Sequence, residues 1–205
     1  WGKHKFVNNI EAREDGGTPA FLQTIKAALC IKLKEEMGID KLRDREEELV
    51  KIAFAGLKKI PTLHILAGNI EHRLGAISFY VENIHYNLIV KILNDRFGVQ
   101  VRGGCSCAGT YGHYLLHVDP NRSKIITDKI DQGDLSEKPG WVRMSIHPTM
   151  TDTELTTAIN GIAQIVENID EWSEDYIYDK SKNEFFHKNS DGSDLEKIKS
   201  WFAIS

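Results

Sequence analysis

The sequence contains few cysteines, no long apolar run and no excess of positive charge, and each of these absences excludes a class of protein. Three cysteines are too few for a disulfide framework, and their odd number suits a reducing compartment, so we expect a cytoplasmic protein. No run of about 18 apolar residues exists, so no membrane span is readable, and no secretory signal is visible. Because 26 Lys and Arg residues are outnumbered by 30 Asp and Glu residues, a dedicated nucleic-acid-binding protein is disfavoured.

What the chain does contain is the composition of an ordinary globular protein. Its 205 residues are 41% hydrophobic and 27% charged, which excludes a collagen, a wholly disordered chain and a coiled-coil rod. A chain of this length can bury on the order of 70% of its unfolded surface, which is enough for a sizeable core. The length predicts one domain with an appendage, or two small domains.

The first part of the chain predicts a helical lead-in. Helices are expected over about 18–37 and 40–59, because apolar residues recur at helical spacing in both segments. Thr18 is expected to cap the first helix, and Cys30 to pack inertly within its apolar run. The charge run 43–48 in the second helix is interpreted as a solvated surface.

The spacing of the apolar residues then changes, which predicts a layered α/β domain over residues 61–172. Helices between the strands are expected to begin at Asn83 and at Thr151, where Thr151 and Glu154 form a capping box. The expected strands cover 63–67, 76–81, a segment that starts at Val99, and 142–146.

Two segments have a weaker pattern. Residues 110–140 lack strong periodicity and are expected to form a functional or mobile insertion. Residues 173–205 are expected to form a C-terminal extension. In it, 176–178 and 184–186 flank a polar turn and predict a hairpin, and a short helix is expected to end near Phe202.

The sharpest chemical feature is the glycine-rich segment Gly103–Gly109, which contains Cys105 and Cys107. Glycine lets the backbone approach a ligand closely, and a turn at a strand end presents its side chains to an open crevice. A thiol has a pKa near about 8.5 and becomes a nucleophile when a cation such as Arg102 favours the thiolate. A glycine-rich turn with two incidental cysteines is the alternative.

His113 and His117 follow these cysteines and allow two interpretations. Either histidine could be the cation that favours a thiolate. Together with Cys105 and Cys107 they also form the pattern C-x-C-x5-H-x3-H, which could bind a metal ion. Structural zinc usually has a longer spacing between its cysteines, so we assign no metal to these residues.

Two further features could bind anions. Arg102 and Arg143 lie in predicted strands, and an arginine at a strand end can hold a carboxylate with two hydrogen bonds, a surface ion pair being the alternative. The segment Asp15–Pro19 offers the Thr18 hydroxyl and backbone N–H groups such as that of Gly17 at a helix start. That arrangement suits a phosphate, and a plain helix cap is the alternative.

In this order, these features resemble the C-terminal part of the class V aminotransferase family, the fold-type I pyridoxal-phosphate enzymes. The segment Arg13–Pro19 is similar to the family's R-x-E-x-G-T-P segment, and Arg102–Ala108 to its R-x-G-x-x-C-A segment. Trp141–Ser145 is similar to the late strand of the family's small domain. The likeness covers about residues 8–172, and within the family the cysteine desulfurase and selenocysteine lyase branch is the most similar.

The resemblance implies a fold and a function. The fold is the small domain of a fold-type I enzyme, with a mixed or antiparallel sheet of about four strands over 61–172. It is preceded over 1–60 by the end of the large domain and linking helices. Cys107 corresponds to the nucleophile that takes sulfur from a substrate cysteine, or a related amino acid, as a persulfide. Arg102 corresponds to the arginine that binds the substrate carboxylate.

The resemblance also implies a cofactor and partners. Thr18, next to Gly17, corresponds to the hydroxyl that reaches the phosphate of pyridoxal phosphate across the interface of a homodimer. A sulfur-acceptor protein is the expected macromolecular partner, and neither nucleic acid nor a membrane is expected.

Two departures from the family pattern bear on these expectations. No lysine of this sequence stands in the context of the lysine that holds the cofactor, so we expect a C-terminal fragment of a longer enzyme that is inactive alone. The cysteine segment reads Gly-Cys-Ser-Cys where desulfurases commonly have Gly-His-His-Cys, which resembles molybdenum-cofactor sulfurases and makes Cys105 a candidate second thiol. A class V aminotransferase or lyase without persulfide chemistry stays open, as does a non-enzymatic metal-binding or interaction module.

Overall fold

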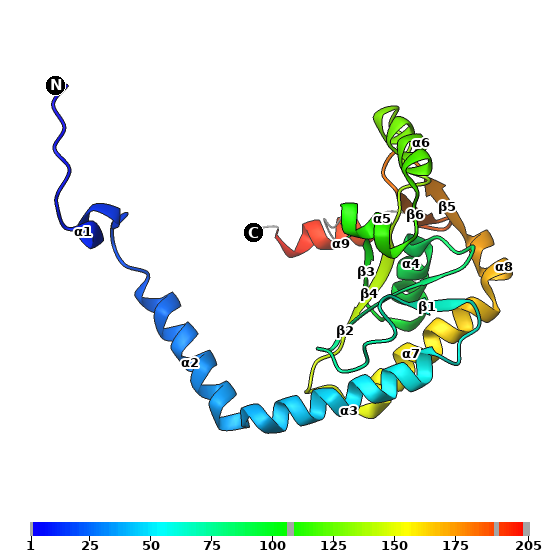
Figure 1. Cartoon of the computed structure of the whole chain (residues 1–205), viewed down its shortest axis with the longest axis horizontal. Helices are drawn as coiled ribbons and strands as arrows, with labels where there is room; N and C mark the ends of the chain where they lie inside the picture. The colour runs from blue at the N-terminus through cyan, green and yellow to red at the C-terminus, as the bar shows by residue number, and fades with distance from the viewer. Residues whose placement is uncertain (1, 106–108, 191–192, 203–205) are drawn as a thin grey trace. The chain divides into compact units, whose positions relative to one another are not determined.

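The computed structural model describes residues 2–105, 109–190 and 193–202, and it divides into two compact units, Trp1–Arg43 and Asp44–Ser205 (Figure 1). The first unit contains α1 (Ile10–Glu14), α2 (Phe21–Met37) and the start of α3 (Ile39–Leu57). The second contains the rest of α3 and every strand that the structure describes. Among the described helices, none is both long and apolar enough to cross a membrane.

In the first unit, α2 confirms the first predicted helix but not its cap. Ala20 stands at the N-cap and no side chain caps the helix, so the prediction for Thr18 was wrong. Thr18 lies too far before the first helical turn, because the chain enters the helix only at Phe21. At the other end Gly38, with φ of +85°, is the C-cap as its conformational freedom predicts.

The apolar stripe of α2 does not form a core. No residue of α2 is buried, and Cys30 is exposed, so the prediction of a packed Cys30 was wrong. The reason is that an apolar stripe is buried only by a facing element, and α1, the other complete helix of the first unit, also has no buried residue.

The second unit is built on a four-stranded antiparallel sheet, which confirms the predicted α/β class. Its strands are β1 (Leu63–Ile65), β2 (Ala76–Val81), β3 (Arg102–Gly104) and β4 (Trp141–Ser145), in the order β1-β2-β4-β3. Val99 and Val101 precede β3 and do not pair, contrary to the predicted start of this strand. They are half-buried against the core instead, which explains their apolar character.

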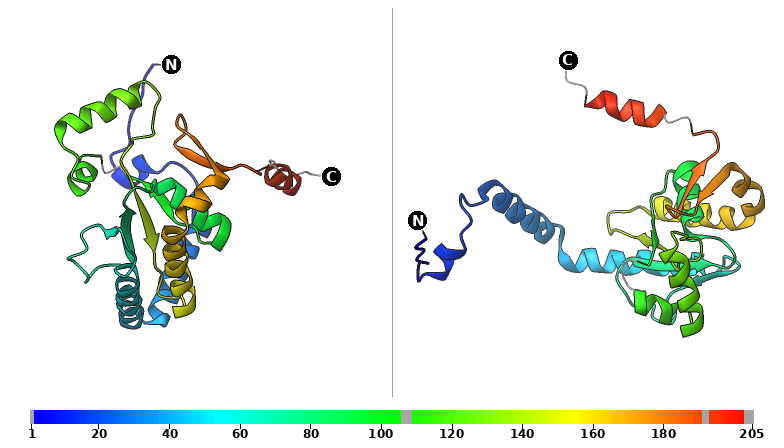
Figure 2. Two further views of the ribbon diagram at one scale, coloured as in Figure 1. Left: turned by 90° about the vertical axis from the view of Figure 1, so that its right-hand side faces the viewer. Right: turned by 90° about the horizontal axis from the view of Figure 1, so that it is seen from above.

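The core lies between one face of this sheet and the helices α3, α4 (Tyr86–Phe97) and α7 (Asp152–Glu167). Helices α3 and α7 lie side by side (Figures 1 and 2), where Gly56 lets the side chain of Ile159 approach the backbone of α3. The largest fully buried side chains come from all of these elements: Phe54, Phe79, Leu49, Leu57, Ile77, Ile89, Ile92, Leu93, Leu155, Ile162, Ile165 and Val142.

The ends of α4 differ in part from the prediction. His85 is the N-cap, and its Nδ1 accepts the backbone N–H of Asn87 at 3.1 Å, so the predicted cap Asn83 was wrong. Asn83 adopts φ of +61°, so it forms the turn before the helix rather than its cap. Gly98 ends α4 in the left-handed conformation, which glycine adopts readily.

Residues 110–140 contain two helices where no regular structure was predicted. These are α5 (Gly109–Leu115) and α6 (Pro120–Asp131), and only Gly112 and Ile126 in them are buried, which explains the weak periodicity. Asp119 caps α6 by accepting the N–H groups of Asn121 and Arg122 at 2.9 and 3.1 Å. Asp119 followed by Pro120 at the first helical position was therefore the missed signal.

The C-terminal extension forms the predicted hairpin and helix. After α8 (Ile169–Trp172) and a 3-10 turn (Ser173–Asp175), β5 (Tyr176–Asp179) pairs with β6 (Glu184–His187). The hairpin packs against α4 (Figure 2), and its Tyr176 belongs to the core. The final helix is α9 (Ser193–Trp201).

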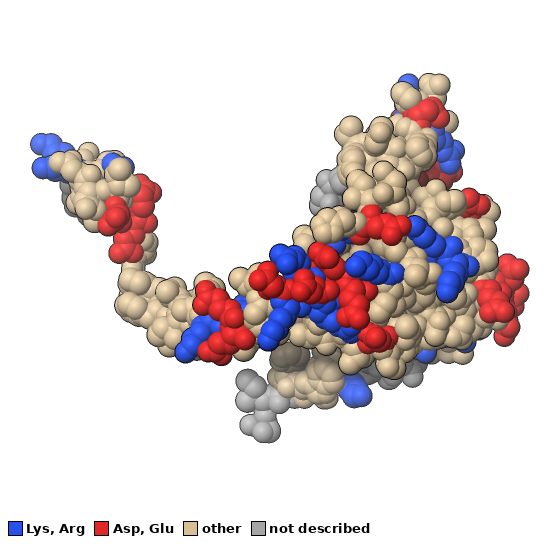
Figure 3. Space-filling view, turned by 60° about the horizontal axis from the view of Figure 1, so that its bottom comes forward, with Lys and Arg blue, Asp and Glu red and all other residues tan. Residues whose placement is uncertain are grey.

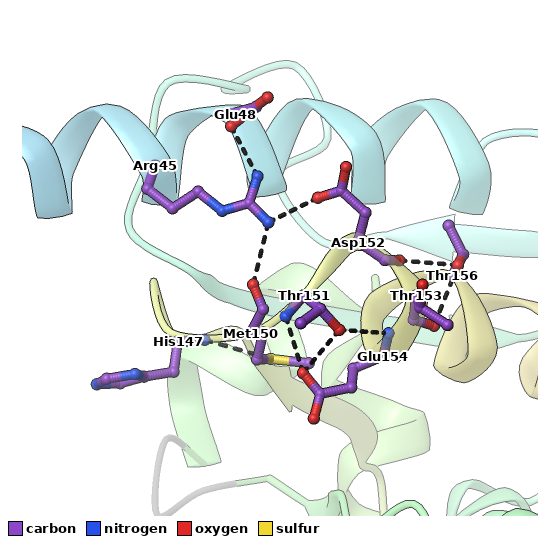
Figure 4. Close-up of polar contacts among 9 residues, drawn as sticks. All are labelled: Arg45, Glu48, His147, Met150, Thr151, Asp152, Thr153, Glu154 and Thr156. Atoms are coloured by element: carbon purple, nitrogen blue, oxygen red, sulfur yellow. Dashed lines mark hydrogen bonds and ion pairs between the residues drawn. The ribbon is translucent and has the colours of Figure 1, made fainter.

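The charge run of α3 is more than a solvated surface, contrary to its interpretation from sequence. Figure 3 shows basic and acidic side chains interspersed on this face. Arg45 reaches to the start of α7 and donates to Asp152 at 2.6 Å and to the carbonyl of Met150 at 3.0 Å (Figure 4). The predicted capping box is present beside it, since Glu154 N–H donates to Thr151 Oγ1 at 3.2 Å and Thr151 N–H to Glu154 Oε2 at 2.8 Å.

Candidate active site

The glycine-rich segment begins in β3, at one edge of the sheet, and its first glycine is explained by packing. A Cβ atom on Gly103 would collide with Oδ1 of Asn87 and lie 3.1 Å from the ring of Tyr86, both in the first turn of α4. Gly104 meets no such contact but has φ of +120°, which favours glycine. One glycine is therefore required by close approach and the next by backbone conformation.

Two arginines face each other where β3 meets β4. Arg102 and Arg143 are directly paired residues of the two antiparallel strands, so their side chains leave the same face of the sheet. That face is opposite to the core, because the neighbouring Val142 and Met144 of β4 are buried among the helices. Like charges at paired positions destabilise a sheet unless an anion lies between them.

No such anion is provided by the described side chains. Neither Arg102 nor Arg143 forms an ion pair with any carboxylate in the parts of the chain that the structure describes. The Nε atom of Arg143 is buried and has no hydrogen-bond partner there. Two guanidinium groups on one face can bind a carboxylate with charge-assisted hydrogen bonds, so this pair is a candidate carboxylate site.

Cys105 is the first residue after β3 and is half-buried with a free thiol. Tyr86, which is 6% exposed, lies against the preceding strand at Gly103. Burial raises the pKa of Tyr86, the hydrogen bond from Asn183 opposes this rise, and the charge of a Cys105 thiolate adds to it.

Of the other residues predicted to take part in thiol chemistry, the structure describes His113 and His117. Cys107 lies outside the described residues, so its predicted role as nucleophile stays a prediction. His113 lies in α5, and His117 follows it with φ of +54°. Among the described residues, no group of three or more His, Cys, Asp or Glu side chains is arranged to hold a metal ion.

The predicted phosphate-binding residues lie in the first unit, before α2. Gly17 has φ of +133°, and its N–H donates to Oδ1 of Asp15 at 3.2 Å, so this N–H is directed to a carboxylate. Thr18 is exposed, and its hydroxyl has no hydrogen-bond partner in the described ranges. The Thr18 hydroxyl therefore fits a phosphate as a donor, whereas the Gly17 N–H would first have to leave Asp15.

The structure also identifies residues that the sequence did not single out. Tyr86 and Asn87 support β3 from beneath, and Asn183 of the C-terminal hairpin is hydrogen-bonded to both. Arg143 was visible in the sequence, but only the pairing of β3 with β4 brings it opposite Arg102. The available signal was the alternation of Arg143 with buried Val142 and Met144, which places it on the exposed face.

Comparison with known proteins decides the family. Residues 3–157 match the family described as Aminotransferase class-V. The chain belongs to this family. The match includes both of the segments on which the resemblance rests, Arg13–Pro19 and Arg102–Ala108, as well as the arginine pair of β3 and β4.

Several relatives in the class-V family are cysteine desulfurases by name. The chain is 29% identical over 124 residues to "Probable cysteine desulfurase 2" of Mycobacterium leprae, which covers 60% of this chain and 29% of that protein. It is 33% identical over 96 residues to "Probable cysteine desulfurase" of Pyrococcus abyssi, which covers 47% of this chain and 24% of that protein. The chain thus spans less than a third of the length of these relatives.

A solved structure supports the fold. The apo structure of a cysteine desulfurase from Thermococcus onnurineus superimposes with a TM-score of 0.55 at 24% identity, covering 76% of this chain and 34% of that one. This likeness confirms the predicted fold, which is the mixed α/β architecture of part of a fold-type I enzyme.

Proposed function

We propose that this chain is part of a pyridoxal-phosphate-dependent cysteine desulfurase and contributes its small α/β domain. The observation that supports the proposal is the pair Arg102 and Arg143, two guanidinium groups on one face beside the strand that leads into Cys105 and Cys107. The similarity to proteins named cysteine desulfurases, at 29% and 33% identity, points to the same activity.

In this proposal the arginine pair binds the substrate. The carboxylate of cysteine accepts hydrogen bonds from Arg102 and Arg143, which neutralises the repulsion between two paired cations. A carboxylate held at this edge of the sheet places the rest of the amino acid near the end of β3. The substrate sulfur is then presented to the cysteine segment.

The thiol of Cys107 takes the sulfur. Its thiolate attacks the substrate sulfur, a sulfur–sulfur bond forms, and the carbon–sulfur bond breaks with its electron pair left on carbon. Protonation of that carbon gives alanine, and Cys107 holds the persulfide. Pyridoxal phosphate, when bound, supplies an electron sink for the substrate carbon. The Thr18 hydroxyl of the partner protomer in a homodimer would hold the phosphate of this cofactor.

The remaining roles follow from the same assignment. Cys105, half-buried at the end of β3, is proposed as a second thiol that relays the sulfur. Its thiolate attacks the outer sulfur of the persulfide, Cys107 leaves as a thiolate, and a thiol of a sulfur-acceptor protein then takes the sulfur from Cys105 in the same way. We assign the cofactor lysine to none of the lysines of this chain and propose that sequence beyond these 205 residues supplies it. On that basis the chain alone is inactive, and a cytoplasmic location stays a prediction from its cysteine content.

The proposal is tested on the full-length protein that contains this chain. Alanine and sulfide formed from cysteine are measured for the parent, for Cys107→Ala, and for Cys30→Ala as a matched control, since Cys30 is exposed in α2 and has no role in the proposal. We expect Cys107→Ala to lose both products and Cys30→Ala to keep them.

Two outcomes would contradict the proposal. Undiminished alanine and sulfide from Cys107→Ala would remove this thiol from the reaction. Keto-acid formation from amino acids without sulfur, with no sulfide from cysteine, would instead identify an aminotransferase or lyase without persulfide chemistry.

A further inference from the structure

We propose that Asn183, in the turn of the C-terminal β5–β6 hairpin, is a positioning residue for the cysteine segment and acts through the ring of Tyr86. The inference rests on the proposed function for its meaning in catalysis, because it assigns the hairpin a role in placing the reactive thiols. Its structural basis lies wholly within the second unit and involves the described residue Cys105.

Asn183 is the point where the hairpin is fastened to the start of α4. Its Nδ2 donates to the hydroxyl of Tyr86 at 2.7 Å, and its Oδ1 accepts from the hydroxyl of Tyr178 at 2.8 Å. Its backbone carbonyl accepts from Nδ2 of Asn87 at 2.5 Å. Asn183 also adopts φ of +58°, a conformation that asparagine and glycine tolerate best.

This fastening is supported by a cluster of rings under the hairpin. His85 stacks on Tyr86 with ring centroids 4.5 Å apart, and the rings of Tyr178 and Phe185 lie 5.2 and 5.3 Å from His85. Stacked and tilted rings at such distances attract one another, which holds the hairpin against the first turn of α4. The rings therefore help to keep Asn183 at hydrogen-bonding distance from the Tyr86 hydroxyl.

The other side of the Tyr86 ring carries the strands of the candidate site. A Cβ on Gly140, just before β4, would lie 2.5 and 2.6 Å from Cε1 and Cζ of this ring and 3.0 Å from Cα of Gly104. A Cβ on Gly103 would lie 3.1 Å from Cδ2. The ring is thus in close contact with both strands at the point where β3 leads into Cys105.

Because the Tyr86 ring is in direct contact with Gly103 and Gly140, a displacement of the ring shifts β3 and the start of β4. Tyr86 is 6% exposed and cannot move outward without opening the core. The hydrogen bond from Asn183 fixes the one free end of the ring, its hydroxyl. The hairpin therefore sets where the ring lies, and the ring sets where the chain enters the cysteine segment.

The chain as it stands can test this inference through the reactivity of one thiol. In a background with Cys30→Ser and Cys107→Ser, Cys105 is the remaining cysteine, and its rate of reaction with the disulfide reagent 5,5′-dithiobis(2-nitrobenzoic acid) is followed from about pH 6 to 9. Asn183→Gly removes the side-chain hydrogen bonds and keeps a residue that tolerates the positive φ. We expect the rate of this half-buried thiol to rise about fivefold, the factor of one ordinary hydrogen bond.

Two further variants separate positioning from general loss of stability. Ser181→Ala removes the hydrogen bond of Ser181 Oγ to Asp179 at 2.6 Å, in the same turn but without contact to Tyr86, and should leave the Cys105 rate unchanged. Tyr86→Phe removes the acceptor of Asn183 and should raise the rate as Asn183→Gly does, with no further rise in the double variant.

An unchanged Cys105 rate and pH profile in both Asn183→Gly and Tyr86→Phe would overturn the inference, as would an equal rise in Ser181→Ala. If Asn183→Gly does not fold, Tyr86→Phe alone decides the question. The readout needs neither cofactor nor turnover, so its result is independent of whether Cys107 proves to be the nucleophile that attacks the substrate sulfur.

Discussion

Replacement of Gly103 by alanine perturbs the candidate site at its tightest contact. The added methyl group would collide with Oδ1 of Asn87 and come within 3.1 Å of both Cδ2 of Tyr86 and Cγ2 of Val90. Asn87 cannot turn aside freely, because its Nδ2 donates to the carbonyl of Asn183 at 2.5 Å. Overpacking of this kind typically costs about 1–3 kcal/mol, and we expect Gly103→Ala to lie near about 2 kcal/mol.

The assay is equilibrium unfolding of the chain in urea, followed by circular dichroism. Gly109→Ala is the matched control, since a Cβ there meets nothing within 4 Å, φ is not positive, and alanine at a compatible position stabilises by about 0.4–1 kcal/mol. If Gly103→Ala unfolds at the same urea concentration as the parent, or if Gly109→Ala loses as much stability, the glycine is not required by packing.

Three further predictions concern titration and the contact between α3 and α7. Burial lowers the pKa of His85 below its unfolded value of about 6.5. The contribution of neutral His85 to the free energy of unfolding is therefore complete above that pH and is lost as pH falls below it. His85→Asn keeps a capping side chain, and its free energy of unfolding should lack this acid dependence. Burial and the charge of Asp95 raise the pKa of Tyr176 to about 12. The contribution of Tyr176 to folding stability is therefore complete below about pH 10 and is lost as pH rises through about 12. An alkaline absorbance titration of Tyr176→Phe should lack this late step. Arg45→Met should lower the midpoint of thermal unfolding by breaking the contacts of Arg45 with Asp152 and Met150, and a midpoint that does not move would show that these contacts add nothing.

The predicted elements that proved correct are those in which local and global signals agree. The capping box Thr151–Glu154, the strand over 76–81 and the C-terminal hairpin were all predicted from short patterns. Each depends on neighbours in sequence or on alternation along one strand, so the sequence carries the whole signal.

Some of the failed predictions were local, namely the helix caps Thr18 and Asn83, whereas others depend on partners distant in sequence. The exposure of Cys30 reflects that no element of its own unit covers α2, which an apolar stripe cannot reveal. Arg45 was assigned to solvent because its acceptors, Met150 and Asp152, lie about a hundred residues later. The helices of 110–140 were missed because so few of their residues are buried.

The candidate site divides in the same way. Arg102, Cys105 and the glycine segment could be found from sequence, because they are adjacent and form one motif. The pairing of Arg102 with Arg143 and the support from Asn183 could not, since both depend on sheet order and on the packing of the hairpin against α4. Contacts between elements 40 and more residues apart are fixed by tertiary packing rather than by local pattern.

The most direct test of the central claim is the location of the transferred sulfur. The full-length protein is incubated with cysteine, and its peptides are analysed by mass spectrometry under conditions that preserve persulfides. The account predicts a mass increase of one sulfur atom on the peptide that contains Cys107, together with alanine in equal amount. Formation of alanine with no sulfur on that peptide would contradict this role of Cys107, whether it is seen in the parent protein or, at the same rate, in Cys105→Ala.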